Sequence, residues 1–73
     1  MIFNCWIIKG NKKGKDFYWT KNNNFRDISK CRVFMDKEFA LKQVQKAIKH
    51  IKDSNDILWG ECKIVHCILK EEI

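Results

Sequence analysis

The chain has 73 residues, of which 45% are hydrophobic and 12% aromatic, and it contains no proline. This length allows a single domain with a modest core, because so short a chain buries only about 60% of its unfolded surface. The composition excludes a disordered chain. The longest apolar stretch near the N-terminus, Cys5 to Ile8, is too short for a signal peptide or a membrane span. We therefore expect a cytoplasmic protein with no membrane partner.

The net charge of +6 belongs entirely to the first half of the sequence. Residues 1–35 contain eight Lys or Arg and two acidic residues, whereas residues 36–73 contain seven of each sign. Only two of the cations are arginine, and a lysine-rich composition is also what codon bias in an AT-rich genome produces. The first half is nevertheless where we expect an acidic partner to bind.

The first elements in chain order predict a β-hairpin. Ile2 to Ile8 is short and rich in Ile, Phe and Trp, and both of its faces are largely apolar, which is typical of a central strand. Lys9 to Lys15 contains two glycines and an asparagine, residues that accept positive φ, so we expect a hairpin loop there. Asp16 to Thr20 is the returning strand.

The middle of the chain predicts a turn, a third strand and the main helix. Phe25 to Cys31 offers Asp27 as the N-cap of a brief helical turn, and Arg32 to Met35 is expected to form a short third strand. Asp36 is the expected N-cap of a helix that runs to about Asp53. The apolar face of this helix, predicted from spacings of three and four, consists of Ala40, Leu41, Val44, Ala47, Ile48 and Ile51.

Glu61 to Leu69 is the predicted last strand, and it also is apolar on both faces, which favours an interior position. The expected order is β-β-β-α-β: one α+β domain over residues 1–73, with a short antiparallel sheet and one amphipathic helix on one face. A single helix leaves the other face open as a candidate partner or self-association surface, unless loops cover it. The residues expected on that open face are Trp6, Ile8, Tyr18, Ile64 and His66.

The chemistry of an enzyme or a metal site is not recognisable. The four cysteines, Cys5, Cys31, Cys62 and Cys67, are interpreted as small buried hydrophobic residues in a reducing compartment. The spacing of cysteines and histidines does not fit a zinc site. Neither His50 nor His66 has an obvious acid or nucleophile as a partner in the sequence, and there is no phosphate-binding loop. We predict no catalytic residue, no metal and no cofactor.

Cations interleaved with aromatic residues are the strongest surface signal. Such a surface suits nucleic acid, a nucleotide or an acidic groove on another protein, although arginine is scarce and no nucleic-acid-binding signature is present. The helix lysines Lys42, Lys46, Lys49 and Lys52 are more simply a solvated face. The residues expected to bind a partner are Lys12, Lys13, Lys15, Tyr18, Lys21, Arg26, Trp6 and His66.

Three segments together resemble small bacteriophage and prophage proteins of unknown function. They are Phe17-Tyr-Trp19, the run Phe25-Arg-Asp-Ile-Ser-Lys-Cys-Arg-Val-Phe34 followed by a helix entering at Ala40, and Glu61-Cys-Lys-Ile-Val65. The resemblance covers about two-thirds of the chain and involves mostly core and turn positions. It implies a non-enzymatic protein of the kind that includes inhibitors of host defence, among them anti-CRISPR proteins.

We therefore rank three hypotheses. The first is a phage-encoded inhibitor that binds and blocks a bacterial defence effector, or the nucleic-acid complex of that effector, in the cytoplasm of the infected host. The second is a small basic protein that binds nucleic acid or sequesters a cyclic nucleotide. The third is a structural homodimer, because domains of this size often depend on self-association.

Overall fold

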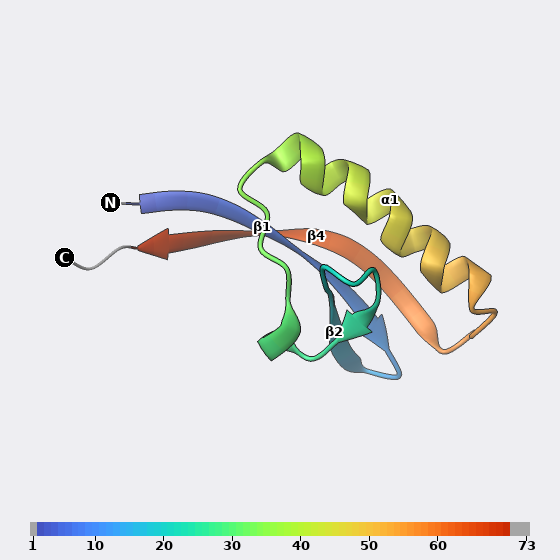
Figure 1. The fold of residues 1–73 in the computed structure, drawn as a ribbon. Helices are drawn as coiled ribbons and strands as arrows, with labels where there is room; N and C mark the ends of the chain where they lie inside the picture. Colours follow the sequence, from blue (N-terminus) through green and yellow to red (C-terminus); the bar gives the residue numbers. More distant parts are fainter. Residues whose placement is uncertain (1, 71–73) are drawn as a thin grey trace.

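The computed structural model describes residues 2–70 and shows one helix and a four-stranded antiparallel sheet with the strand order β3-β2-β1-β4 (Figure 1). The predicted α+β fold and order of elements are confirmed. The elements are β1 (Ile2–Lys12), β2 (Lys15–Trp19), β3 (Phe25–Arg26), the 3-10 helix η1 (Ile28–Lys30), α1 (Lys37–Asp53) and β4 (Trp59–Lys70).

β1 is the central strand, as its two apolar faces predict. It pairs with β4 from Ile2 to Lys12 and with β2 from Lys9 onward. The β1–β2 loop is shorter than expected, because both strands extend to a two-residue turn. Lys13 and Gly14 in this turn have φ values of 56° and 79°, the backbone that lets a tight hairpin follow the twist of its strands.

The prediction of a third strand at Arg32 to Met35 is wrong, and β3 lies earlier in the chain. Only Phe34 pairs there, through two 2.8 Å backbone hydrogen bonds with Trp6 of β1. Two residues earlier, the Arg32 N–H donates to the carbonyl of Trp19 at the end of β2. Residues 32–35 thus bond first to β2 and then to β1, and they form a continuous ladder with neither strand.

The helix begins where the sequence predicts. The Asp36 side chain accepts a hydrogen bond from the Glu38 N–H at 3.0 Å, which makes Asp36 the N-cap. The predicted apolar face is correct except at Leu41, which is 45% exposed, while Gln43 is buried in its place. The buried stripe is narrower than the sequence suggests and is centred on Ala40, Val44 and Ala47.

The helix covers one face of the sheet, here named the covered face, which carries Trp6, Ile8, Gly10 and Ile64. Ile8 is fully buried, and Trp6 and Ile64 are partly buried against the core. The prediction that Trp6, Ile8 and Ile64 lie on the open face is therefore wrong. The sequence pattern was ambiguous because Ile7 and Ile8, on opposite faces of β1, are equally apolar.

The opposite side of the sheet, here named the open face, carries Ile7, Lys9, Tyr18, Arg26 and Lys63. Lys9 is the direct cross-strand partner of Tyr18, and Tyr18 is the partner of Arg26. Side chains of directly paired residues lie on the same face of a sheet. Of the five residues predicted on the open face, Tyr18 is thus the one that lies there.

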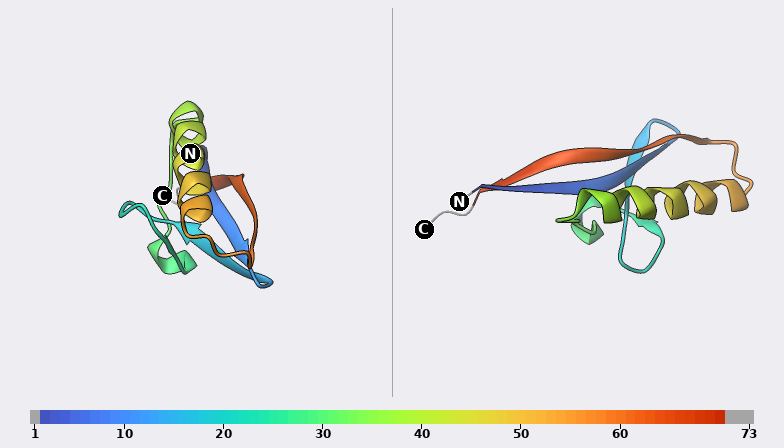
Figure 2. Two further views of the ribbon diagram at one scale, coloured as in Figure 1. Left: turned by 90° about the vertical axis from the view of Figure 1, so that its right-hand side faces the viewer. Right: turned by 90° about the horizontal axis from the view of Figure 1, so that it is seen from above.

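β4 is an edge strand, not the interior strand that its apolar faces suggest. Together with the first half of β1 it runs beyond the helix as a two-stranded projection, visible in Figures 1 and 2. This projection explains the elongated shape of the molecule, whose principal extents are 45 × 23 × 19 Å. Within residues 2–70, no helix has the length and apolar character needed to span a membrane.

Candidate functional site

One row of polar side chains crosses all four strands on the open face. Cross-strand pairing places Lys63 of β4 beside Lys9 of β1, Lys9 beside Tyr18 of β2, and Tyr18 beside Arg26 of β3. The half-buried Tyr18 ring therefore has a cation on each side. An aromatic ring between cations on a sheet surface is a suitable platform for a nucleobase and its phosphates.

Two acidic residues partly neutralise the β4 end of this row. Lys9 Nζ lies 3.8 Å from Asp16 Oδ2, and the Asn11 amide donates to the other Asp16 oxygen at 3.0 Å. Glu61 lines the same shallow hollow as Lys9 and Lys63. The attraction for an anion is consequently weaker at this end than at the β3 end.

The β3 end opens into a hollow that is rich in cations. Its volume is about 280 Å³, and it is lined by Thr20, Lys21, Asn22, Asn24, Arg26 and Lys30. A hydrogen bond between the Thr20 hydroxyl and the Asn24 carboxamide closes the 20–24 loop around it. Within residues 2–70 the only ion pairs are Lys9–Asp16 and Lys12–Asp56, so these three cations have no ion-pair partner among the described residues.

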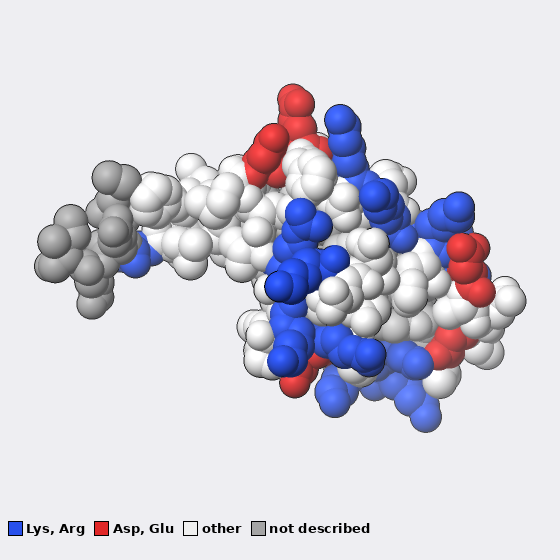
Figure 3. All heavy atoms as spheres, in the orientation of Figure 1, with Lys and Arg blue, Asp and Glu red and all other residues white. Residues whose placement is uncertain are grey.

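We name this surface, made of Tyr18, Lys21, Arg26 and Lys30, the basic hollow. Lys30 was not among the predicted site residues. It lies in η1, which carries it to the same side as the 20–24 loop. The signal that could have found it is the predicted helical turn after Asp27, since a turn that short returns the chain toward β3. Asp27 precedes this turn without a side-chain cap hydrogen bond and accepts one from the Ser29 hydroxyl instead. Figure 3 shows lysine and arginine atoms gathered in a band over this part of the molecule.

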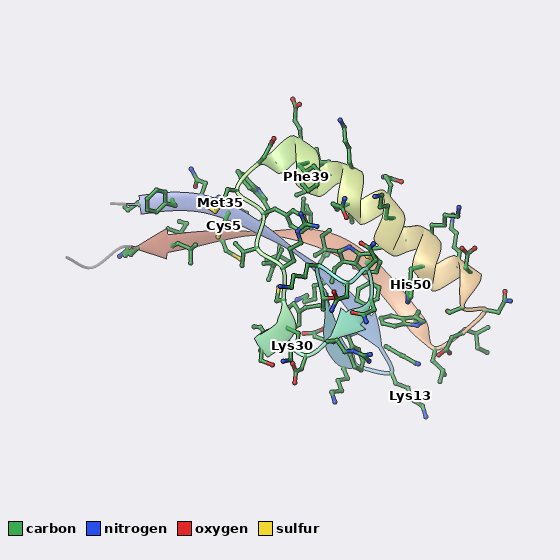
Figure 4. The ribbon with its side chains drawn as sticks, in the orientation of Figure 1. Cys5, Lys13, Lys30, Met35, Phe39 and His50 are labelled. Carbon is green, nitrogen blue, oxygen red and sulfur yellow. The ribbon has the colours of Figure 1, made fainter. Side chains whose placement is uncertain are left out.

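The predicted hairpin-tip lysines form a separate group at the other end of β2. Lys12 is held by Asp56 at 2.6 Å and lies 5.5 Å from the Trp59 ring centroid. The hydrogen bond from Lys12, followed by one from the Leu58 N–H, lowers the pKa of the Asp56 carboxyl below its usual value. Lys15 lies 5.3 Å from the Phe17 ring. Lys13 points away from the hairpin tip and is exposed (Figure 4).

Trp6 and His66 were also predicted to bind a partner. They are cross-strand partners on the covered face, the next pair on that face toward the N-terminus of β1 after Ile8 and Ile64. The rings of Trp6 and His66 are 5.5 Å apart, and His66 Nε2 is 3.0 Å from the Asn4 carboxamide oxygen. They line a hollow with Lys37 at the start of α1. The eight predicted site residues thus fall into three separate groups. Lys12, Lys13 and Lys15 lie at the hairpin tip, Trp6 and His66 lie on the covered face, and Tyr18, Lys21 and Arg26 lie at the β3 end of the open face.

All four cysteines are free thiols, and three of them gather near the middle of the sheet. Cys5 and Cys67 are direct cross-strand partners. Burial, together with the neighbouring Cys67, raises the pKa of Cys5 and that of Cys31. Burial raises the pKa of Cys62 to about 11. A raised pKa keeps a thiol protonated, and the protonated form is a poor nucleophile and a poor metal ligand.

In the described part of the chain, no three His, Cys, Asp or Glu side chains are arranged to hold a metal ion. Comparison with known proteins adds no further guide. No family model matches the chain, and neither the curated proteins nor the solved structures contain a match to it. These comparisons therefore assign no function to the chain.

Proposed function

We propose that this protein is a non-enzymatic binding protein whose basic hollow binds a phosphate-bearing strand, with single-stranded nucleic acid as the ligand. The observation that carries the proposal is a hollow lined by three cations, Lys21, Arg26 and Lys30, which have no ion-pair partner among residues 2–70. One of them, Arg26, is the cross-strand partner of Tyr18. Unpaired cations repel one another, and a polyanion relieves that repulsion as it releases its own counterions.

The shape of the surface favours a single strand over a duplex. The four-residue row crosses the surface of the sheet, and Tyr18 offers a ring on which an unpaired base can stack. The hollow at the β3 end accepts phosphate, while Asp16 and Glu61 at the β4 end discourage it. A strand would therefore lie with its bases over Tyr18 and its backbone toward Lys21 and Lys30.

Titration of a fluorescent single-stranded oligonucleotide at several salt concentrations tests this proposal. We expect binding that weakens steeply with salt, with each phosphate contact contributing about −0.7 to the slope of log K against log [salt]. The double variant Lys21→Gln/Arg26→Gln should make that slope shallower by about 1.4. Tyr18→Leu should weaken binding by about 5- to 150-fold, because one stacked base contributes about 1–3 kcal/mol.

The matched control is the double variant Lys42→Gln/Lys46→Gln, which removes the same charge from exposed positions of α1. It should retain the slope of the wild-type protein. Equal losses in both double variants would show that net charge, not the basic hollow, attracts the strand. Absence of binding at low salt would overturn the proposal.

A narrower role, that of a phage-encoded inhibitor of a bacterial defence effector, is supported by the resemblance to phage proteins. In that role the same basic surface would contact an acidic groove of the effector or the nucleic acid that the effector holds. A pull-down from a host lysate before and after nuclease treatment separates the two cases. No recovered effector and no protection of phage in defence-positive cells would overturn this role.

A further inference from the structure

The two-stranded projection has exposed apolar side chains on both of its faces. It consists of Ile2 to Cys5 of β1 and Cys67 to Lys70 of β4, and we name it the arm. Its four large hydrophobic residues are exposed by 65% (Ile2), 36% (Phe3), 58% (Ile68) and 46% (Leu69). A two-stranded ribbon alone is at best marginally stable in water. The arm therefore lacks the cover that α1 gives to the rest of the sheet.

The outer edge of β4 in the arm has free backbone hydrogen-bonding groups. Both backbone groups of Trp6 bond Phe34, so Trp6 and its partner His66 form a pair that exchanges no hydrogen bonds between β1 and β4. The N–H and C=O of His66 consequently point outward from the sheet. Because this direction alternates along a strand, the backbone groups of Ile68 point outward as well.

Apart from Lys70 at the tip of the arm, this edge carries none of the usual features that prevent strand pairing. Ile64 to Leu69 contains six consecutive residues without a charge or a proline. The one irregularity in the β1–β4 pairing is at the opposite end, between Gly10 and Lys12. Edge strands of natural proteins are commonly protected by charged side chains, proline or bulges. An unprotected apolar edge is accordingly a site for another strand.

We propose that a second copy of this chain occupies the edge, with the two β4 strands paired antiparallel about a two-fold axis in the arm. An antiparallel strand is its own complement under such an axis, so one surface serves both partners. Charge points to the same occupant. An acidic partner would be drawn to the cations of the body, whereas two copies with a net charge of +6 each repel unless they meet through uncharged parts.

The position of the arm meets this requirement. It projects from the end of the molecule away from the hairpin and the band of cations. Its one Lys or Arg is Lys70 at the tip, and the rest of the arm is white in Figure 3. Two chains joined there keep their basic bodies apart. The inference is independent of the proposed ligand, and the dimer would present two basic hollows that one long strand can contact together.

Multi-angle light scattering over a concentration series tests the dimer. The wild-type protein should approach twice the chain mass of 8.8 kDa. Ile68→Pro removes an N–H that points outward, so β1–β4 pairing is retained while strand addition is blocked. Ile68→Lys places a charge next to its own copy. Both variants should have the mass of one chain where the wild-type protein has the mass of two.

The matched control is Ile57→Lys, which adds the same charge at a residue that is 95% exposed in the loop before β4. It should dimerise like the wild-type protein. Circular dichroism shows whether Ile68→Pro folds, and Ile68→Lys decides the matter if it does not. A wild-type mass of one chain at every concentration, or a dimer that survives Ile68→Lys, overturns the proposal.

Discussion

The two faces of the sheet are built from alternate residues of the same strands, yet they differ in kind. The covered face packs the rings of Trp19 and Phe25 edge to face at 5.0 Å beneath α1. The open face places Lys9, Tyr18 and Arg26 in one row. The first face holds most of the buried core, and the proposed binding surface lies on the second. A substitution should therefore affect one property with little effect on the other.

The sharpest test of this division compares Ile8 with its neighbour Ile7. Ile8 is fully buried on the covered face, whereas Ile7 is half-buried on the open face. Ile8→Ala should lower the free energy of unfolding by about 2–5 kcal/mol through lost burial and a cavity. Ile7→Ala should lower it by about half as much or less, because less of its surface leaves water on folding. Urea unfolding followed by circular dichroism measures both.

A domain of 73 residues has a total stability of about 4–11 kcal/mol, so Ile8→Ala is liable to be unfolded without denaturant. The pair Ile8→Val and Ile7→Val then makes the same comparison with a smaller deletion of about 0.5–1.5 kcal/mol at the buried site. Equal effects at the two positions would contradict the assignment of the faces.

The sequence predicts the fold better than it predicts which face is covered. Three features depend on neighbours in the chain. The structure confirms Asp36 as the helix N-cap, the apolar face of α1 except at Leu41, and a glycine turn in the hairpin at Gly14. The assignment of the covered face depends on tertiary packing, and the apolar pair Ile7 and Ile8 gives no local signal. The polar residues Lys9 and Tyr18, which lie on the open face, were the available indication of which face the helix leaves uncovered.

The candidate site shows the same limit. Tyr18 and Arg26 could be named from the sequence because cations near aromatic residues are a recognisable pattern. The place of Lys30 in the same hollow as Arg26 could not be predicted, since it depends on where η1 returns the chain. The hairpin-tip lysines do not line the same hollow, because the five-residue strand β2 separates the two ends.

A second, smaller effect is expected at Gly10, where the covered face leaves no room for a side chain. A Cβ atom there would lie 3.0 Å from ring atoms of both Phe25 and Trp59, whose centroids are themselves 4.8 Å apart. Gly10→Ala should destabilise the protein by about 1–3 kcal/mol through overpacking. Thermal unfolding provides the measurement.

Gly60 is the matched position, because the nearest atom to a Cβ there is the Asn11 carbonyl oxygen at 3.6 Å, an ordinary contact. Gly60→Ala should change stability by less than about 1 kcal/mol, in the stabilising direction, because alanine restricts the unfolded chain. If Gly10→Ala were equally harmless, the aromatic cluster would be looser than the structure indicates.

A further effect concerns the thiol of Cys62, the cross-strand partner of Gly10 on the covered face. Burial raises its pKa from about 9 to about 11, so the folded state binds this proton more tightly than the unfolded state does. The resulting stability is fully present below pH 9 and is lost as pH rises toward 11. Lysines also titrate in this window, so Cys62→Ala is the reference, and it should show a smaller loss of stability between pH 9 and 11.

Alkylation offers an independent measurement at the same residue. Iodoacetamide labelling of Cys62 in the folded protein should keep accelerating up to about pH 11, because only the thiolate reacts. Trypsin cleaves after Lys63 and so separates Cys62 from Cys67, which lets mass spectrometry follow each thiol alone. A labelling rate that levels off near pH 9 would mean that α1 does not shield this part of the sheet. In that case the distinction between a covered and an open face would fail at the end of the sheet nearest the hairpin.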